Sequence, residues 1–268
     1  MDWTSTTALI TGASSGIGAA TARYLAQRGM RVILIARREE LLIAVQQEIE
    51  SAGGTAIVLP ADLSSESDRI RVYREVITSY GVPDILINNA GFGWYGYFLD
   101  MPFEIARNLI EVDVMATVHL THLFLPLMLQ KPEARIINIG SIAGGLPEQG
   151  VAMYASAKAF LNSFSTSLFR ELRGTSTSVS ILRAGPVRTE FFDRARNQPN
   201  GHSVPAESMA VSADRIAAGI WRLIRRPRRV LYVPFYYLFS PLLETLFGWA
   251  IDLVGPLLLR KNIKKIPR

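Results

Sequence analysis

Short apolar runs alternate with longer amphipathic stretches along most of the chain. Six of these runs are rich in β-branched residues and show no polar alternation, which predicts strands buried on both faces of a parallel sheet. They cover residues 7–11, 31–36, 55–60, 84–87, 135–139 and 178–182. Between them, apolar residues recur at helical spacing, for example over 39–51, 68–80 and 103–130. The pattern predicts an α/β fold, a doubly wound parallel sheet of about seven strands with helices on both faces.

A glycine-rich turn follows the first predicted strand directly. Residues 11–18 read TGASSGIG and lead into a helical pattern. Gly12 permits a tight turn, Gly16 allows a phosphate to approach the backbone, and Gly18 lets helix and strand pack closely. The N–H groups at the start of the helix favour an anion. Such glycines can be purely structural, but between a strand and a helix they favour a dinucleotide site in a Rossmann-type fold.

The end of the second predicted strand indicates which dinucleotide binds. In NAD-binding domains a carboxylate at this point usually holds the ribose 2′-hydroxyl. This chain has Ala36 followed by Arg37 and Arg38, and arginines suit a 2′-phosphate through charge and bidentate geometry. We therefore predict NADP(H) as the cofactor. Two alternatives stay open, namely a basic helix start in solvent and the use of NAD(H).

Polar and small residues also follow the third and fourth predicted strands. Asp62 and Leu63 come after the third strand, where ligands lie in open parallel sheets. Asp62 either accepts a hydrogen bond from the adenine amino group or caps the helix that follows. The sequence at 88–91 closes the fourth strand with two asparagines, an alanine and a glycine. Trp94, in the aromatic loop behind it, belongs either to the rim of a substrate pocket or to a buried loop.

Tyr154 and Lys158 are spaced four residues apart within a helical pattern. Residues at this spacing stand on one face of a helix, so the phenol and the ammonium become neighbours. A nearby positive charge favours the ionised phenol and lowers its pKa, which suits it to proton transfer. Ser141 follows the fifth predicted strand, thirteen residues before Tyr154. A strand-end hydroxyl and a helix phenol can therefore meet over one carbonyl.

The order and spacing of these motifs resemble the short-chain dehydrogenases/reductases over about residues 4–189. The resemblance rests on the glycine turn, the sequence at 88–91, Ser141, and Tyr154 with Lys158. It implies that Tyr154 is the catalytic acid/base and that Ser141 orients the substrate oxygen. It further implies that Lys158 binds the nicotinamide ribose and depresses the Tyr154 pKa. Homodimers or homotetramers are also implied.

From the patterns and the resemblance together we predict the residues of the site. Besides Tyr154 and Lys158, the predicted cofactor-binding residues are Gly12, Ser14, Ser15, Gly16, Ile17, Gly18, Arg37, Arg38, Asp62, Leu63, Asn88, Ala90, Gly91, Gly185, Val187 and Thr189. The predicted substrate contacts are Ser141, Tyr154 and Trp94.

Two positions depart from the family pattern. Asp113 stands where the family has an asparagine that supports a proton relay, and an aspartate lacks the amide donor and can carry charge. We keep Asp113 in the predicted catalytic set. Ala184 stands where the family has a proline, before the retained Gly185. These departures leave open a second class of function, a catalytically impaired NADP(H)-binding sensor or membrane-associated adaptor.

Composition and charge exclude several kinds of chemistry. The chain has no cysteine and only 3 His residues, so we predict no thiol nucleophile and no metal site. The net charge of +6 is concentrated near the end, because residues 222–268 contain ten Lys or Arg and two acidic residues while the rest carries −2. A basic surface spread over the fold is therefore absent, and we expect no nucleic-acid partner.

Residues 230–259 are strongly apolar and lie between cation clusters at 225–229 and 260–265. Their longest uncharged run, 230–243, is shorter than the ~20 residues that cross a bilayer. Three alternatives stay open, namely attachment to an anionic membrane surface through 230–265, packing on the core or on a second subunit, and a true span. We therefore divide the chain into a catalytic domain, 1–229, with a mobile lid at about 190–212, and a C-terminal extension of the same domain, 230–268.

The leading hypothesis is an NADP(H)-dependent oxidoreductase that transfers a hydride between nicotinamide and a carbonyl or alcohol, with Tyr154 moving the proton. The apolar tail and the aromatics around Trp94 favour a lipophilic small-molecule substrate such as a steroid, a retinoid or an acyl compound. The start of the chain lacks a secretory signal pattern. We therefore expect a cytoplasmic location, peripheral on a membrane if the tail binds lipid.

Overall fold

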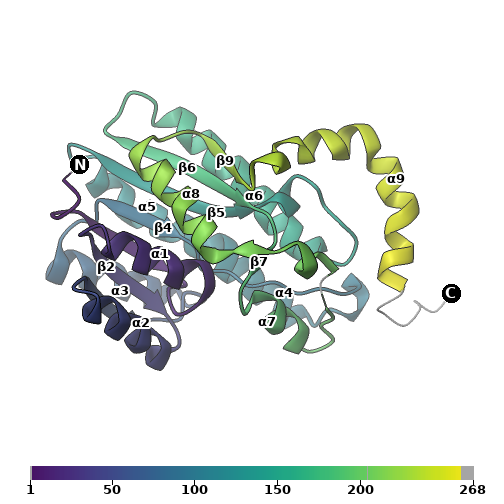
Figure 1. Cartoon of the computed structure of the whole chain (residues 1–268), viewed down its shortest axis with the longest axis horizontal. Coiled ribbons are helices and arrows are strands. Elements are labelled where there is room, and N and C mark those ends of the chain that lie inside the picture. Colours follow the sequence, from purple (N-terminus) through teal and green to yellow (C-terminus); the bar gives the residue numbers. More distant parts are fainter. Residues whose placement is uncertain (1, 204, 261–268) are drawn as a thin grey trace.

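Seven parallel strands form the central sheet of the protein, in the order β3-β2-β1-β4-β5-β6-β9 (Figure 1). The structure is a computed structural model and describes residues 2–203 and 205–260. The strands are β1 (Thr7–Thr11), β2 (Arg31–Ala36), β3 (Thr55–Pro60), β4 (Ile85–Asn88), β5 (Ala134–Ser141), β6 (Thr177–Ala184) and β9 (Val230–Val233). A separate two-stranded ribbon pairs β7 (Val187–Arg188) with β8 (Val211–Ser212).

Helices cover both faces of the sheet and divide the core into two layers. One face carries α1 (Gly16–Ala26), α2 (Glu39–Ser51) and α8 (Ala213–Arg225), and the other carries α3 (Glu66–Tyr80), α5 (Ala116–Met128) and α6 (Ala152–Glu171). Within β1, Ala8 and Ile10 pack into the first layer and Leu9 into the second. Strands buried on both faces need apolar residues at every position, which explains the unbroken apolar runs. The predicted α/β fold is confirmed.

The stretch 103–130, which the periodicity predicts as one helix, is a helix with a local change of winding. It consists of α4 (Phe103–Leu109), a π-helical segment (Ile110–Met115) and α5. A π-helical turn holds an extra residue and often marks a functional site. Asp113 lies in this segment and is fully buried.

The C-terminal part of the chain differs from the predicted division. Residues Val230–Val233, which the prediction assigned to the extension, form β9, the edge strand of the sheet beside β6. The extension proper is a 3₁₀ turn (Phe235–Phe239) and α9 (Ser240–Arg260), which stands out from the sheet and its helices in Figure 1. The segment 190–212 is not a plain loop either, because it contains α7 (Phe191–Asn197) and a 3₁₀ turn (Pro205–Met209).

One helical run among the described residues, Phe103–Met128, is long and apolar enough to cross a membrane. Its α5 part lies against the sheet and buries Leu120, Phe124 and Met128 in the second core layer. Burying a side chain such as Phe124 completely contributes about 2–3 kcal/mol to folding. The apolar character of this run is therefore accounted for by core packing.

Gly18 is required for the contact between α1 and the turn that precedes it. A Cβ atom at Gly18 would lie 2.2 Å from the carbonyl oxygen of Gly12. We expect Gly18→Ala to lower the free energy of unfolding by about 1–3 kcal/mol or more, as overpacking does, measured by urea denaturation. Gly145→Ala is the matched control, because its Cβ would meet nothing closer than 3.5 Å. Equal stability of the two variants would contradict this account of the turn.

Candidate active site

A cavity of about 670 Å³ lies at the carboxyl ends of the strands. The ends of β1 and β4 both reach it, and between these neighbours the strand order reverses direction, which is where open α/β sheets bind ligands. Most of the predicted site residues line it: Gly12, Ser14, Ser15, Gly16, Ile17, Arg37, Arg38, Asp62, Leu63, Ala90, Gly91, Trp94, Ser141, Tyr154, Lys158, Gly185, Val187 and Thr189.

Three predicted site residues do not line the cavity. Gly18 lies beneath the turn, against Gly12. Asp113 is buried behind Lys158, as described below. Asn88 is buried on the face of the sheet that α5 covers. Its Nδ2 donates to Asn138 Oδ1 of β5 at 2.9 Å and to Thr121 Oγ1 of α5 at 3.1 Å. The geometry gives Asn88 a structural role in joining β4 to its neighbours.

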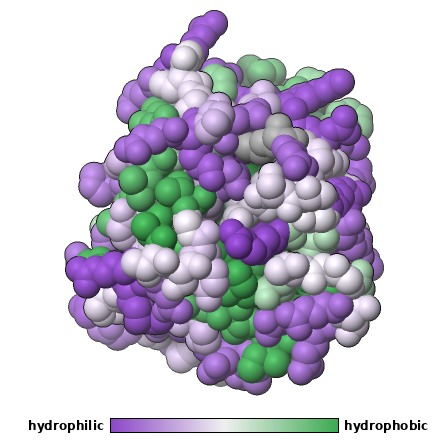
Figure 2. All heavy atoms as spheres, turned by 90° about the vertical axis from the view of Figure 1, so that its left-hand side faces the viewer, coloured by the Kyte–Doolittle hydropathy of each residue, from purple (hydrophilic) through white to green (hydrophobic). Residues whose placement is uncertain are grey.

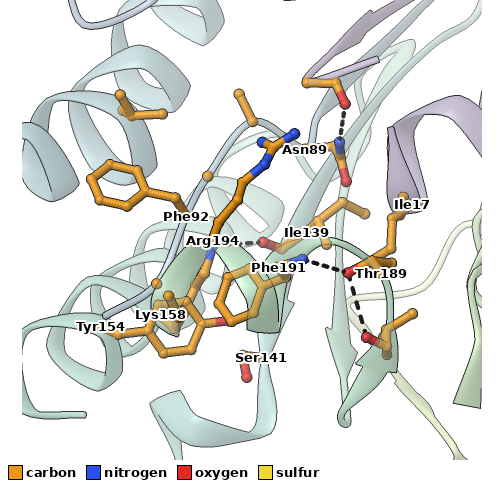
Figure 3. Close-up of a pocket in the computed structure, with 18 of the residues that line it drawn as sticks. Ile17, Asn89, Phe92, Ile139, Ser141, Tyr154, Lys158, Thr189, Phe191 and Arg194 are labelled. Atoms are coloured by element: carbon orange, nitrogen blue, oxygen red, sulfur yellow. Dashed lines mark hydrogen bonds between the residues drawn. The ribbon is translucent and has the colours of Figure 1, made fainter. Parts of the chain in front are cut away.

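The neighbouring Asn89 lines the cavity and was not predicted as a site residue. Its Nδ2 donates to the carbonyl oxygens of Thr11 at 2.8 Å and Gly12 at 3.2 Å and so ties the end of β4 to the glycine turn. Figure 3 shows Asn89 at this end of the cavity. Sequence reasoning could have found it, because Asn88 and Asn89 are adjacent and side chains on a strand alternate between faces.

The glycine turn has the backbone geometry that a dinucleotide pyrophosphate needs. Gly12 and Gly16 have φ values of 67° and 55°, which favour glycine. A Cβ at Gly12 would come within 2.9 Å of the Cα of Ala90. No side chain caps the first turn of α1, so its N–H groups remain available to an anion at the cavity. The residues present therefore fit a nicotinamide dinucleotide.

Arginines gather beside this turn from two different elements. Arg38, after β2, donates to Ser15 Oγ at 3.0 Å and to Ser14 Oγ at 3.2 Å, and Arg194 of α7 donates to the same Ser15 Oγ at 3.1 Å. Both guanidinium groups also pair with Glu190. Partial burial raises the pKa of Glu190, but the two arginines outweigh it and hold the pKa below its usual value. Arg194 was not predicted, because the segment 190–212 shows little periodicity.

Asp62 stabilises the turn after β3. Its Oδ1 accepts hydrogen bonds from the backbone N–H of Ser64 at 3.0 Å and from Ser64 Oγ at 2.8 Å. The N-cap of α3 is Ser65, whose hydroxyl accepts from the N–H of Asp68. Asp62 thus orders the residues before α3 but does not cap that helix, so the predicted capping role is wrong. Its side chain lines the cavity, and the contact with adenine stays a prediction.

Tyr154, Ser141 and Lys158 meet at one end of the cavity (Figure 3). Tyr154 and Lys158 stand one turn apart on α6, with Lys158 Nζ 5.5 Å from the centre of the Tyr154 ring. Ser141 ends β5, and its hydroxyl accepts a hydrogen bond from the N–H of Ala143 at 3.1 Å. The ring of Phe191, from α7, lies 5.4 Å from the Tyr154 ring. A phenol, a hydroxyl and an ammonium are thus brought to one place.

Asp113 forms a buried ion pair with Lys158. The Asp113 Oδ2 atom lies 2.8 Å from Lys158 Nζ, and its Oδ1 accepts from the backbone N–H of Phe92 at 3.0 Å. Burial raises the pKa of Asp113, and the Lys158 charge and the Phe92 N–H offset this only in part. Burial lowers the pKa of Lys158, but Asp113 and Tyr154 outweigh it and leave the pKa above its usual value.

The expected pKa of Tyr154 needs a correction. The spacing of Tyr154 and Lys158 predicts a lowered Tyr154 pKa, and Lys158 does act in that direction. Burial of the phenol is the larger effect, however, and the Asp113 carboxylate adds to it, so the Tyr154 pKa is raised above its usual value. A hydrogen bond with Ser141 also lowers it without reversing the sign. The effect of the Lys158 charge on the Tyr154 pKa is opposed by the Asp113 carboxylate, which is paired with Lys158.

Many of the side chains that line the cavity are apolar. Trp94 is buried, and its Nε1 donates to the carbonyl oxygen of Pro199 at 3.0 Å, which joins the loop after β4 to the segment 190–212. Trp94 is therefore buried in its loop and also lines the cavity, while its contact with a substrate stays a prediction. Apolar side chains that line the cavity include Ile105, Val112, Ile142, Leu146, Val151, Phe92, Phe191 and Phe192, and the polar residues Asn108, Glu148 and Gln198 line it as well.

Comparison with known proteins identifies the family. The model of the short chain dehydrogenase family matches residues 6–200. An oxidoreductase of Bacillus subtilis (strain 168) named YvaG is 34% identical over 257 residues, which are 94% of this chain and 95% of that protein. The short-chain dehydrogenase from Sphingobium yanoikuyae in complex with NADPH superposes with a TM-score of 0.79 at 29% identity, covering 98% of both chains.

A third relative carries a more specific name. The very-long-chain 3-oxoacyl-CoA reductase of Laccaria bicolor is 36% identical over 179 residues, which are 65% of this chain and 53% of that protein. Together these matches show that the chain belongs to the short-chain dehydrogenase/reductase family and is an oxidoreductase of that family.

Proposed function

We propose that this oxidoreductase transfers hydride between NADP(H) and a lipophilic carbonyl or alcohol, with Tyr154 as the acid/base. The observation that carries the proposal is the meeting of Tyr154, Ser141 and Lys158 beside a cavity that begins at the glycine turn. NADP(H), bound along this cavity, would supply the hydride chemistry. Ser141 would hold the substrate oxygen by its hydroxyl, and Tyr154 would give a proton to that oxygen during reduction. An impaired sensor is less well supported, because all three side chains are in place.

Tyr154→Phe removes the proton donor and leaves the shape of the site unchanged. We expect a fall in kcat/KM for NADPH-dependent carbonyl reduction of about 10²–10⁴-fold, with the affinity for NADPH retained. The measurement is NADPH consumption over a panel of steroid, retinoid and 3-oxoacyl carbonyls, and Tyr80→Phe on α3 is the matched control. Full activity in Tyr154→Phe, or tight NADPH binding by the wild-type protein without turnover of any carbonyl, would refute the proposed function.

The preference for NADP(H) is supported by the arginines at the glycine turn. Arg37 and Arg38 line the cavity just after β2, where a 2′-phosphate would lie, and Arg194 reaches the same turn from α7. The similar Sphingobium yanoikuyae structure contains NADPH. A guanidinium group binds a phosphate through charge-assisted, often bidentate hydrogen bonds.

Loss of two of these arginines should therefore be selective. We expect Arg37→Ala/Arg38→Ala to weaken NADPH binding about 10²–10⁴-fold, since each hydrogen bond to a charged group contributes about 1.5–3 kcal/mol and two such groups are removed, and to leave NADH binding nearly unchanged. Fluorescence titration of both cofactors measures this, with Arg74→Ala on α3 as the control. Equal losses for NADPH and NADH would contradict the assignment.

The substrate is proposed to be lipophilic because the cavity beyond Tyr154 is walled by aromatic and aliphatic side chains. The name of the Laccaria bicolor relative favours an acyl compound among the candidates. The loop after β5, which contributes Leu146 and Glu148 to the cavity wall, also contacts α9. Gln149 Nε2 donates to the carbonyl oxygen of Ile251 at 3.4 Å, and Pro241 lies 3.5 Å from the position of a Cβ at Gly145.

We also propose that the 3₁₀ turn Phe235–Phe239 and α9 attach to an anionic membrane surface. The large exposed apolar residues there are Phe235, Tyr236, Leu238, Phe239, Leu242, Leu243, Leu246, Phe247, Trp249 and Leu253. The side of the molecule turned away from α9 is more mixed, with hydrophilic residues separating the hydrophobic areas (Figure 2). Interfacial segments combine such an apolar surface with nearby cations.

The structure describes the first of the two predicted cation clusters and only the beginning of the second. The cluster at 225–229 lies at the start of β9, and the apolar turn follows the other end of that strand, about 13 Å away for four residues. The predicted second cluster, 260–265, continues from the end of α9, and residues 261–265 lie outside the described residues. Attachment at this surface would bring the apolar end of the cavity near the lipid, where a lipophilic substrate is concentrated.

Acidic substitutions on α9 should weaken the binding of the protein to anionic membranes. We expect wild-type protein to sediment with vesicles that contain phosphatidylserine and Trp249→Glu/Leu253→Glu to bind them at least about tenfold more weakly, because buried apolar side chains contribute about 1.5–3 kcal/mol each. Leu99→Glu/Ile43→Glu, also at exposed apolar positions, is the control. No sedimentation of the wild-type protein, or equal binding by both variants, would overturn the proposal.

A further inference from the structure

The ion pair between Asp113 and Lys158 changes the charge that acts on Tyr154. Both side chains of the pair are buried, with relative exposures of 0% for Asp113 and 7% for Lys158. Lys158 Nζ also lies 3.4 Å from the carbonyl oxygen of Ile139, to which it donates. The ammonium is therefore held between a carboxylate and a backbone carbonyl, behind the phenol of Tyr154.

Each charge of this buried pair is stabilised by the other, and the carbonyl oxygen of Ile139 also supports the ammonium of Lys158. Removing one partner of a buried ion pair leaves the other charge without compensation, so Asp113 and Lys158 each favour the charged form of the other. The carboxylate is also anchored from a third element, because Phe92, in the loop after β4, donates its N–H to Asp113. Close packing of Gly91 completes the enclosure, since a Cβ there would lie 2.8 Å from Asp113 Oδ2.

The groups that face Tyr154 come from four elements. Lys158 is on its own helix, Asp113 is on the π-helical segment, Ser141 ends β5, and the uncharged ring of Phe191 covers it from α7. Glu148 and Arg194 line the same cavity, but among residues 2–203 and 205–260 the charges that act on the phenol are those of Lys158 and Asp113. The net charge next to Tyr154 is therefore close to zero, whereas an amide at position 113 would leave the ammonium uncompensated.

We propose that Asp113 is a positioning residue that fixes Lys158, cancels its charge and thereby keeps Tyr154 protonated, so that carbonyl reduction persists to more alkaline pH. A protonated phenol is the form that donates in reduction, and the phenolate is the form that accepts in alcohol oxidation. The raised pKa of Tyr154 agrees with this assignment. The consequence for turnover rests on the function proposed above, but the state of the phenol does not.

The test is therefore a titration of Tyr154 that needs no substrate. The near-ultraviolet tyrosinate absorbance of the cofactor-free protein minus that of Tyr154→Phe isolates this phenol. In the wild-type protein we expect its midpoint above the usual value of 10.0. Asp113→Asn, which keeps the size of the side chain and removes its charge, should shift the midpoint down by about one pH unit or more. Each unit is tenfold in the acid dissociation constant.

The activity profile provides the second readout. In Asp113→Asn the alkaline decline of NADPH-dependent carbonyl reduction should move to lower pH by the same amount as the titration. Asp84→Asn is the matched control, because Asp84 also pairs with a lysine, Lys131, at 2.6 Å but lies at the opposite end of β4. Asp84→Asn should change the stability of the protein but should shift neither the Tyr154 titration nor the pH profile of carbonyl reduction. Asp113→Ser serves as a second neutral variant if Asp113→Asn does not fold.

The outcomes separate the two proposals. A wild-type midpoint below 10.0, or neutral variants at position 113 that titrate like the wild-type protein, would overturn the role of Asp113. A shifted titration in a protein that reduces no carbonyl would support the role of Asp113 and refute the proposed function instead.

Discussion

The site depends on one constraint, the parallel direction of all seven strands of the central sheet. Because the strands are parallel, their carboxyl ends meet at the same edge, and the glycine turn after β1, Ser141 at the end of β5 and Gly185 after β6 arrive there together. A parallel sheet in turn needs helices on both faces. The same helices supply Tyr154 and Lys158 from α6 and Asp113 from the segment before α5. Fold and chemistry are therefore set by one arrangement.

Cations at both ends of the cavity are matched by carboxylates, but in different surroundings. At the glycine turn Arg38 and Arg194 share Glu190, whose side chain is 48% exposed. Such exposed pairs contribute little and are screened by solvent, so an incoming phosphate can replace the carboxylate. At Tyr154 the partner of Lys158 is fully buried, and no solvent can substitute for it. At the glycine turn the arginines can therefore exchange Glu190 for another anion, whereas at Tyr154 the pairing of Lys158 with Asp113 stays fixed.

Local patterns made much of the structure predictable from the sequence. The strands, the glycine turn and the spacing of Tyr154 and Lys158 depend on neighbours in the chain, and the structure brings these residues to one cavity. Contacts between residues far apart in the chain could not be predicted from the sequence. The pairing of Asp113 with Lys158 joins residues far apart in sequence, Arg194 lies on a segment of weak periodicity, and β9 resembles the apolar tail that follows it. The direction of the Tyr154 pKa shift depends on how deeply the phenol is buried, and the spacing of residues in the sequence does not show this.

Because the π-helical segment Ile110–Met115 carries Asp113, the number of residues in this segment determines which side chain meets Lys158. Each residue of a helix turns the chain by about 100°. Removal of a single residue from the segment would therefore rotate α4 against α5 by more than a quarter turn and carry the carboxylate away from the ammonium. Relatives with regular winding here would present a different side chain to Lys158, so an insertion or deletion of one residue acts on the chemistry as a substitution would.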